Sequence, residues 1–123
     1  MTFASGSVHA LLFGLHADLA GELLRPLKPF CQDVQSIERA PEGEALKSIA
    51  ESPAQVIFCD TDTNLVSELR SLRPDASIVV VSRHPEVEGW LDSIEAGADD
   101  YCAAPFESAQ LGWILKTSRR SGQ

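Results

Sequence analysis

The sequence predicts an α/β domain in which five parallel strands form one doubly wound sheet with helices on both faces. Short apolar, β-branched runs alternate with longer segments of helical period, as in strands joined by helical crossovers. Two runs, VIFC and IVVV, are almost continuously hydrophobic, which is typical of strands buried on both faces. The chain has 123 residues, of which 44% are hydrophobic, and this is enough for one core. We therefore expect residues 1–123 to form a single domain.

Each apolar run defines one expected strand. The five strands are expected at Val8–Phe13, Val34–Ile37, Gln55–Cys59, Ile78–Val81 and Asp100–Ala103. In a doubly wound sheet with right-handed crossovers, ligands bind in a crevice at the carboxyl ends of the strands. The residues that directly follow the strands are therefore the candidates for function.

Apolar residues with helical spacing mark the expected helices. The five groups are Leu19, Leu23 and Leu27; Ala45, Leu46, Ile49 and Ala50; Leu65, Val66, Leu69 and Leu72; Val87, Leu91 and Ile94; and Leu111, Ile114 and Leu115. Such stripes usually face the core. Asp18 precedes the first group as a possible helix cap, and Gly43 precedes the second. Proline has no backbone N–H, so Pro26 and Pro29 predict that the first helix kinks or ends early.

Composition excludes several classes of function. The chain has 18 acidic and 10 basic residues, and its net charge of −8 repels phosphate backbones and anionic lipid. Direct binding of nucleic acid or membrane is therefore not expected. No apolar run approaches the ~20 residues that span a bilayer, and the first residues lack a secretion signal, which predicts a cytoplasmic protein. Cys31, Cys59 and Cys102 are odd in number and widely spaced, which favours reduced, buried thiols.

One segment carries a family resemblance. Residues 97–106 read GADDYCAAPF, similar to the GADDYLxKPF segment of the receiver domain of bacterial response regulators. Asp60 ends VIFCD where that family places its phosphoacceptor aspartate, and Ser82 lies at the family's usual distance before this segment. The resemblance implies the flavodoxin-like receiver fold, Asp60 as a phosphoacceptor candidate, and Ser82 and Tyr101 as a switch pair. Ser82 as a cap and Tyr101 as a packing residue are the alternatives.

The chain departs from the family's pattern at three positions. The resemblance implies two acids that hold Mg²⁺ after the first strand, but Gly14 and Leu15 stand there and offer no side-chain oxygen. The family's lysine falls at Ala104, which carries no charge. Asp18 is either a substitute ligand or a helix cap. The loop after Asp60 is also about three residues shorter than usual for the family. We expect no metal site, no cofactor and loss of Mg²⁺ binding.

Two tryptophans are candidates for a contact surface. Trp90 lies on the expected fourth helix, and Trp113 lies at the edge of the apolar stripe of the fifth. Receiver domains commonly bind partners through the fourth helix, fifth strand and fifth helix. Exposed aromatic residues there suit an interface, and ordinary packing at the edge of the core is the alternative.

The leading hypothesis is a pseudo-receiver that signals in a two-component or phosphorelay system through protein contacts, without ordinary aspartyl phosphorylation. Its expected partners are another protein or an output domain, including a second copy or a histidine kinase. The alternative is a true receiver, phosphorylated at Asp60 by a histidine kinase. An enzyme of another class is third, because His16 and His84 are the histidines near the crevice and no acid is placed to orient them. We therefore expect a protein that is not an enzyme.

Overall fold

The computed structural model describes residues 8–15, 17–37, 47, 49–52, 54–83 and 87–117. Within these residues, five strands form one sheet in the order β2-β1-β3-β4-β5, and every neighbouring pair is parallel. The strands are β1 Val8–Phe13, β2 Cys31–Ile37, β3 Val56–Cys59, β4 Ser77–Ser82 and β5 Asp100–Ala103. The predicted doubly wound parallel sheet is confirmed. Its strand order reverses between β1 and β3, the point at which such sheets bind ligands.

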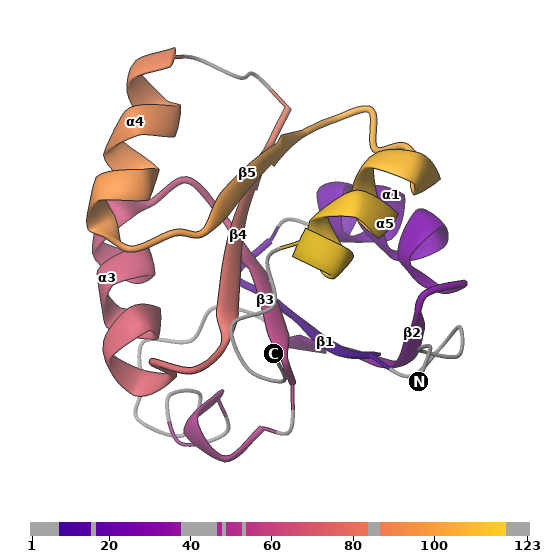
Figure 1. Ribbon diagram of the computed structural model, residues 1–123, viewed down its shortest axis with the longest axis horizontal. Coiled ribbons are helices and arrows are strands. Elements are labelled where there is room, and N and C mark those ends of the chain that lie inside the picture. The colour runs from indigo at the N-terminus through magenta and orange to yellow at the C-terminus, as the bar shows by residue number, and fades with distance from the viewer. Residues whose placement is uncertain are drawn as a thin grey trace.

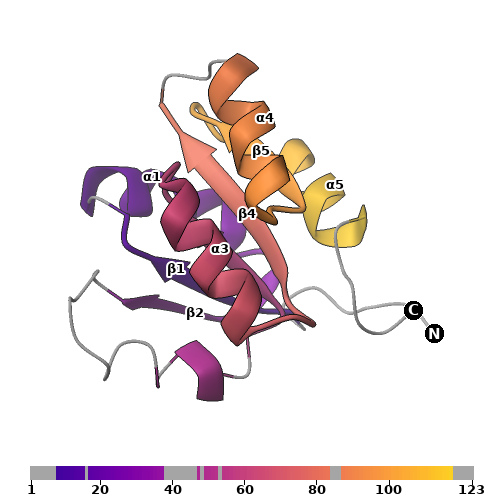
Figure 2. The ribbon, with the colours of Figure 1, turned by 90° about the vertical axis from the view of Figure 1, so that its left-hand side faces the viewer.

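Helices cover both faces of the sheet. They are α1 Ala17–Leu27, α3 Thr63–Leu72, α4 Val87–Ala96 and α5 Ser108–Thr117. Helices α3 and α4 lie side by side on one face, and α1 and α5 lie together on the other (Figures 1 and 2). The expected helix around Ala45 and Leu46 falls partly outside the described residues, but residues 47 and 49–51 are helical and Ile49 is fully buried.

The sheet separates two apolar clusters. Val79 and Val81 of β4 pack on the α1/α5 side, whereas Ile78 and Val80 pack on the α3 side. This alternation follows from the two-residue period of a strand. It also sets the direction of residues near the strand ends: Ala104, just after β5, packs partly buried on the α1/α5 side.

Strand boundaries differ from the prediction where polar residues extend the ladder. Strand β2 begins at Cys31, three residues before the expected Val34, and β4 includes both Ser77 and Ser82. Backbone pairing continues through polar residues that apolarity alone does not detect. In contrast, Gln55 lies just outside β3, although its N–H still donates to the carbonyl of His9 at 2.8 Å.

Proline has the expected effect on α1. The helix ends at Leu27, before Pro29, and Pro26 lies in its last turn. Because proline has no backbone N–H, Pro26 lacks only one helical hydrogen bond, the one to the carbonyl of Glu22 four residues earlier.

The prediction that an apolar stripe of α4 faces the core is partly wrong. Leu91 and Ile94 are 47% and 38% exposed, whereas Ser93 is fully buried. Helix α4 covers the end of the sheet near the edge strand and packs against α3, where the hydroxyl of Ser67 lies 3.4 Å from the carbonyl oxygen of Ala96. A small residue at the buried position permits close approach, and the larger apolar residues then face solvent.

Candidate functional site

The carboxyl ends of β3 and β4 bring the central site residues together. A pocket of about 520 Å³ lies there, and its lining residues are Ala17, Asp18, Leu19, Asp60, Ser82 and Arg83. Asp60 follows β3 directly and Ser82 is the last residue of β4. Two residues singled out from sequence, Asp60 and Ser82, therefore share one pocket with the start of α1.

The loop after Asp60 is short and held by side chains. One carboxylate oxygen of Asp60, Oδ1, accepts a hydrogen bond from the backbone N–H of Thr61 at 2.7 Å, and the Thr61 hydroxyl lies 3.4 Å from the same oxygen. Asp62 caps α3, with Oδ1 accepting from the N–H groups of Asn64 at 2.9 Å and Leu65 at 3.3 Å. Only two residues separate Asp60 from α3.

Backbone geometry at the end of β1 favours glycine. Gly14 has a φ of 72°, in the left-handed region, and its N–H donates to the carbonyl of Ile37 at 3.0 Å. Leu15 packs against the apolar cluster beneath α1 and α5. Asp18 is not the cap of α1, because the helix starts at Ala17, two residues earlier than a cap at Asp18 requires, and Asp18 lies in its first turn. Its exposed side chain lines the pocket that also contains Asp60.

Ala104 follows the last residue of β5 directly. The N–H of Ala104 donates to the carbonyl of Ser82 at 2.8 Å, which fixes Ala104 beside the end of β4. Tyr101 pairs with Val80, two residues before Ser82, and packs partly buried against the α3 side of the core. The two switch-like residues thus lie on neighbouring strands.

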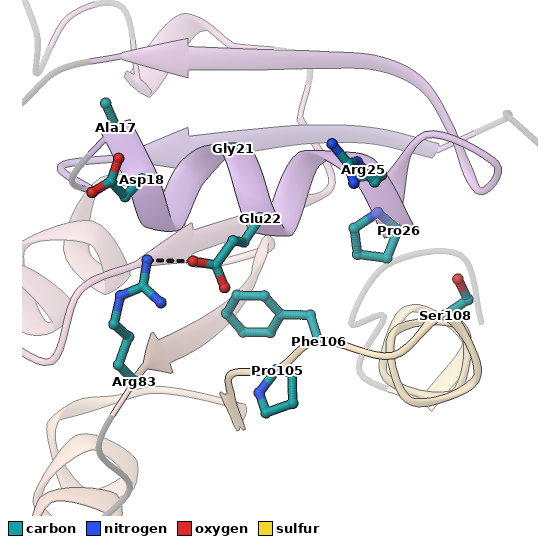
Figure 3. Close-up of a pocket in the computed structure, with 10 residues that line it drawn as sticks. All are labelled: Ala17, Asp18, Gly21, Glu22, Arg25, Pro26, Arg83, Pro105, Phe106 and Ser108. Carbon is teal, nitrogen blue, oxygen red and sulfur yellow. Dashed lines mark ion pairs between the residues drawn. The ribbon is translucent and has the colours of Figure 1, made fainter.

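Arg83 also lines the pocket, a residue expected at the crevice edge but with no role predicted from sequence. Its guanidinium pairs with the carboxylate of Glu22 on α1, across the space between β4 and the helix (Figure 3). The hydrogen bond that Arg83 donates to Glu22 raises the pKa of Arg83, with further contributions from the charges of Glu22 and Asp18. The signal was present in the sequence, because Arg83 lies two residues after the predicted strand Ile78–Val81, at the crevice edge. Its pairing partner, 61 positions earlier, was not visible.

A larger groove adjoins this pocket. It encloses about 840 Å³ between α1 and the segment that joins β5 to α5 (Figure 3). Its lining residues are Ala17, Asp18, Gly21, Glu22, Arg25, Pro26, Arg83, Pro105, Phe106 and Ser108. Ala17, Asp18 and Arg83 line both hollows. The groove and the Asp60 pocket are therefore neighbours with a shared wall.

The described residues supply the Asp60 pocket with two carboxylates and one guanidinium. Across the part of the chain that the structure describes, no three His, Cys, Asp or Glu side chains are grouped so that they could hold a metal ion. Mg²⁺ needs near-octahedral oxygen coordination. His16 and His84 lie outside the described residues.

The remaining candidates are placed clearly. Cys31, Cys59 and Cys102 are buried, and burial raises the pKa of their thiols to about 11, 12 and 11. Trp90 is 44% exposed and Trp113 is 64% exposed, so neither is a core residue.

Among the described helices, none is long and apolar enough to cross a bilayer.

Part of the chain is similar in sequence to a curated transcriptional regulator. No protein-family model matches the chain. The transcriptional regulatory protein PrrA of Mycobacterium tuberculosis is 34% identical over 75 residues, which cover 56% of this chain and 32% of PrrA. The chain thus matches about a third of the length of this curated relative.

Solved structures show the same fold over nearly the whole chain. A CheY-like protein, tadZ, from Pseudomonas aeruginosa PAO1 has a TM-score of 0.76 at 20% identity, covering 89% of this chain and 98% of its own. HP1043, an orphan response regulator of H. pylori, has a TM-score of 0.69 at 26% identity, covering 94% and 99%. This chain has the fold of a response-regulator receiver domain.

Proposed function

We propose that this domain is a pseudo-receiver, which signals through protein contacts and is not controlled by Mg²⁺-dependent phosphorylation of Asp60. The observation that carries the proposal is the residue at the end of β5. Ala104, tied to Ser82 by a 2.8 Å backbone hydrogen bond, stands where the resemblance requires a lysine. An alanine cannot neutralise the charge of a phosphoryl group.

The end of β1 supports the same proposal. Gly14 and Leu15 take the places of the two metal-binding acids, and Leu15 is partly buried against the core. Phosphoryl transfer depends on positioning and on neutralising negative charge, and the loss of a single electrostatic contact commonly lowers the rate ~10²–10³-fold. Losing the lysine and both acids together therefore removes most of the machinery. Mg²⁺ binding is lost in this proposal.

Incubation with a small phosphodonor and Mg²⁺, followed by intact-mass measurement, tests the proposal. We expect no phosphoryl adduct. A receiver that retains both acids and the lysine, treated in parallel, serves as the control for an active donor. A stoichiometric gain of one phosphoryl group that Asp60→Asn abolishes would show that the domain is instead a true receiver.

That second candidate, a true receiver phosphorylated at Asp60 by a histidine kinase, is favoured by one observation. Asp60, Ser82 and the cationic Arg83 line the same pocket, so a positive charge is present near the acceptor despite Ala104. The guanidinium is paired with Glu22, which favours the pseudo-receiver. The mass measurement separates the two functions.

For the contact surface, we propose the exposed face of α4 and α5. Among the described residues, the exposed large hydrophobic side chains are Trp90, Leu91, Ile94 and Trp113. They lie on the two helices that flank the edge strand β5 (Figure 1). Aromatic residues with large contact areas dominate binding energy at protein interfaces. The partners proposed for this surface are a second copy, an output domain or a histidine kinase, and not nucleic acid.

A further inference from the structure

Helix α4 carries most of the exposed apolar surface in the part of the chain that the structure describes. Trp90 and Ile94 are four residues apart and Leu91 and Ile94 are three apart, so the three side chains are neighbours on one side of the helix. The fully buried Ser93 marks the side that packs against the rest of the domain. We call Trp90, Leu91 and Ile94 the α4 patch. The described residues leave this patch uncovered.

Acidic side chains border the α4 patch. The helix sequence VEGWLDSIEA contains acids but no base. Asp92 and Glu95 are both exposed, and Glu95 lies four residues after Leu91, which makes these two side chains neighbours on the helix surface. On the adjacent helix α3, Arg70 pairs instead with Asp99. The surface that surrounds the apolar side chains of α4 is therefore negative, as is the chain as a whole.

This charge disfavours two occupants that the chain itself could supply. In a symmetric dimer the same patch faces itself, so a second copy would bring its own Asp92 and Glu95 up to those of the first, and like charges repel. Residues 118–123, SRRSGQ, include two arginines but no apolar side chain that could cover the patch. A partner with both positive charge and an apolar surface satisfies the two requirements together.

The edge strand beside α4 indicates that this partner is a helix. Strand β5 ends the sheet, and such an edge is where an extended segment would add. The N–H of Tyr101 in this strand already donates to the carboxylate of Asp100 at 2.8 Å. Charged side chains on an edge strand are a common protection against strand addition. A helix that packs on α4 needs no free backbone groups, and it matches apolar side chains that are spaced along a helix.

We propose that the α4 patch docks an amphipathic helix of a different protein, whose apolar face is flanked by lysine or arginine. The apolar face covers Trp90, Leu91 and Ile94, and the basic flank lies beside Asp92 and Glu95. The inference rests on the proposed contact function and names the partner chemistry for the α4 part of that surface. Docking takes place on the protein as synthesised, because the patch is exposed without a phosphoryl group.

Two fluorescein-labelled peptides of about 20 residues, long enough to form a helix, test the proposal. Both have the same leucine face, which is flanked by lysine in one peptide and by glutamate in the other. Fluorescence anisotropy with the unmodified protein measures each affinity. The lysine peptide should bind at least about tenfold more tightly at low salt. Added NaCl should reduce this difference, because salt screens exposed charges.

Three variants locate the binding site. Leu91→Gln should weaken binding of the lysine peptide about fivefold or more, because it removes apolar contact. Glu95→Lys should weaken the lysine peptide by about three- to tenfold and should favour the glutamate peptide. Glu51→Lys is the matched control, since Glu51 is also an exposed, helical glutamate but lies outside α4. The control should change either affinity by less than about twofold.

Three outcomes would overturn the proposal. The first is equal weakening by Glu95→Lys and Glu51→Lys, which would attribute binding to net charge alone. The second is an affinity for the lysine peptide that neither Leu91→Gln nor Ile94→Gln lowers, with thermal melts showing that both variants are folded. The third is a parent that self-associates in sedimentation and that Leu91→Gln makes monomeric, because a second copy would then be the occupant.

The docking and the pseudo-receiver function can fail separately. A phosphoryl adduct at Asp60 would contradict the pseudo-receiver but leave the peptide affinities as evidence for docking. Peptide binding that is indifferent to the α4 variants would contradict docking and leave the mass measurement unaffected.

Discussion

At the scale of single residues, Arg70 of α3 holds several segments of the α3 face together. Its guanidinium donates to the carbonyls of Gly97, Pro74 and Ala76 at distances between 2.9 and 3.1 Å, and it pairs with the carboxylate of Asp99. Asp99 in turn accepts from the N–H of Ile78 at 2.8 Å. This one arginine thus joins α3 to the start of β4 and to the segment before β5.

Arg70→Met should lower the free energy of unfolding by about 2–3 kcal/mol. It leaves several carbonyl groups and the mostly buried Asp99 without their cation, and breaking such a pair by removing one partner is costly. Lys28→Gln, an exposed change that also removes one positive charge, should stay within about 0.5 kcal/mol of the parent. Urea unfolding measures both. Equal stability of the two variants would mean that the network contributes little.

The buried thiols make stability depend on pH. Their pKa values in the folded protein, about 11 to 12, are raised by burial above the usual 9.0, so the unfolded chain loses these protons first. Stability from this source is fully present below pH 9 and is lost as the pH rises towards the folded values. The free energy of unfolding should fall by up to ~1.4 kcal/mol per thiol per pH unit.

Cys59→Val tests this dependence, because Cys59 has the highest pKa of the three. Urea midpoints between pH 8 and 11 should fall less steeply in the variant than in the parent, whatever the variant's stability at neutral pH. Parallel slopes would show that other titrating groups cause the fall.

At the scale of elements, two glycines illustrate how helix context decides the effect of one substitution. Gly97 follows α4 with a φ of 126°, a conformation rarely adopted by residues with side chains, and an added Cβ would lie 3.1 Å from the Cβ of Arg70. Gly21 lies within α1, and an added Cβ there would meet nothing within 4 Å apart from the neighbouring residues and backbone of its own helix.

The same change, glycine to alanine, should therefore change the stability of the fold in opposite directions at these two positions. Gly97→Ala should destabilise the fold by about 1–3 kcal/mol through backbone strain. Gly21→Ala should stabilise it by about 0.5–1 kcal/mol, because alanine favours the helix. Thermal unfolding of both variants measures the difference. A stabilised Gly97→Ala would contradict the strain that the positive φ implies.

At the scale of the whole molecule, the exposed apolar residues of α4 and α5 predict association. Trp113→Ala should weaken self-association or partner capture and leave the melting temperature little changed, because the ring is 64% exposed. Truncation of an aromatic anchor at a desolvated interface commonly costs ~2 kcal/mol or more. Sedimentation of parent and variant measures self-association. Partner capture unaffected by both Trp113→Ala and Trp90→Ala would place the interface elsewhere.

The proposed loss of the metal site predicts that Mg²⁺ has no specific effect on the fold. A ligand that does not bind the native state cannot stabilise it, so millimolar Mg²⁺ should leave the melting temperature and tryptophan fluorescence unchanged. An equal ionic strength of Na⁺ is the control for screening. A saturable rise in melting temperature with Mg²⁺ alone would show that the folded protein binds the ion and would contradict the proposed loss of the metal site.

The strands and most helices of this protein could be predicted from sequence because their signals are local. Apolar runs such as VIFC and IVVV specify buried strands, and the segment from Gly97 to Phe106 identifies the type of domain. The sequence also showed that Gly14, Leu15 and Ala104 depart from the pattern that the resemblance implies. Whether a residue carries a charge or a side-chain oxygen can be judged without coordinates.

Only the tertiary structure decided which distant residues meet. The pairing of Arg83 with Glu22, the shared wall of the two hollows and the hydrogen bonds of Arg70 join segments far apart in the chain. The exposure of Leu91 and Ile94 is decided in the same way, since an apolar stripe shows that a helix has a face but not what covers it. Periodicity records the local conformation of the chain, whereas contacts across the sheet arise from the packing of elements that the sequence does not place side by side.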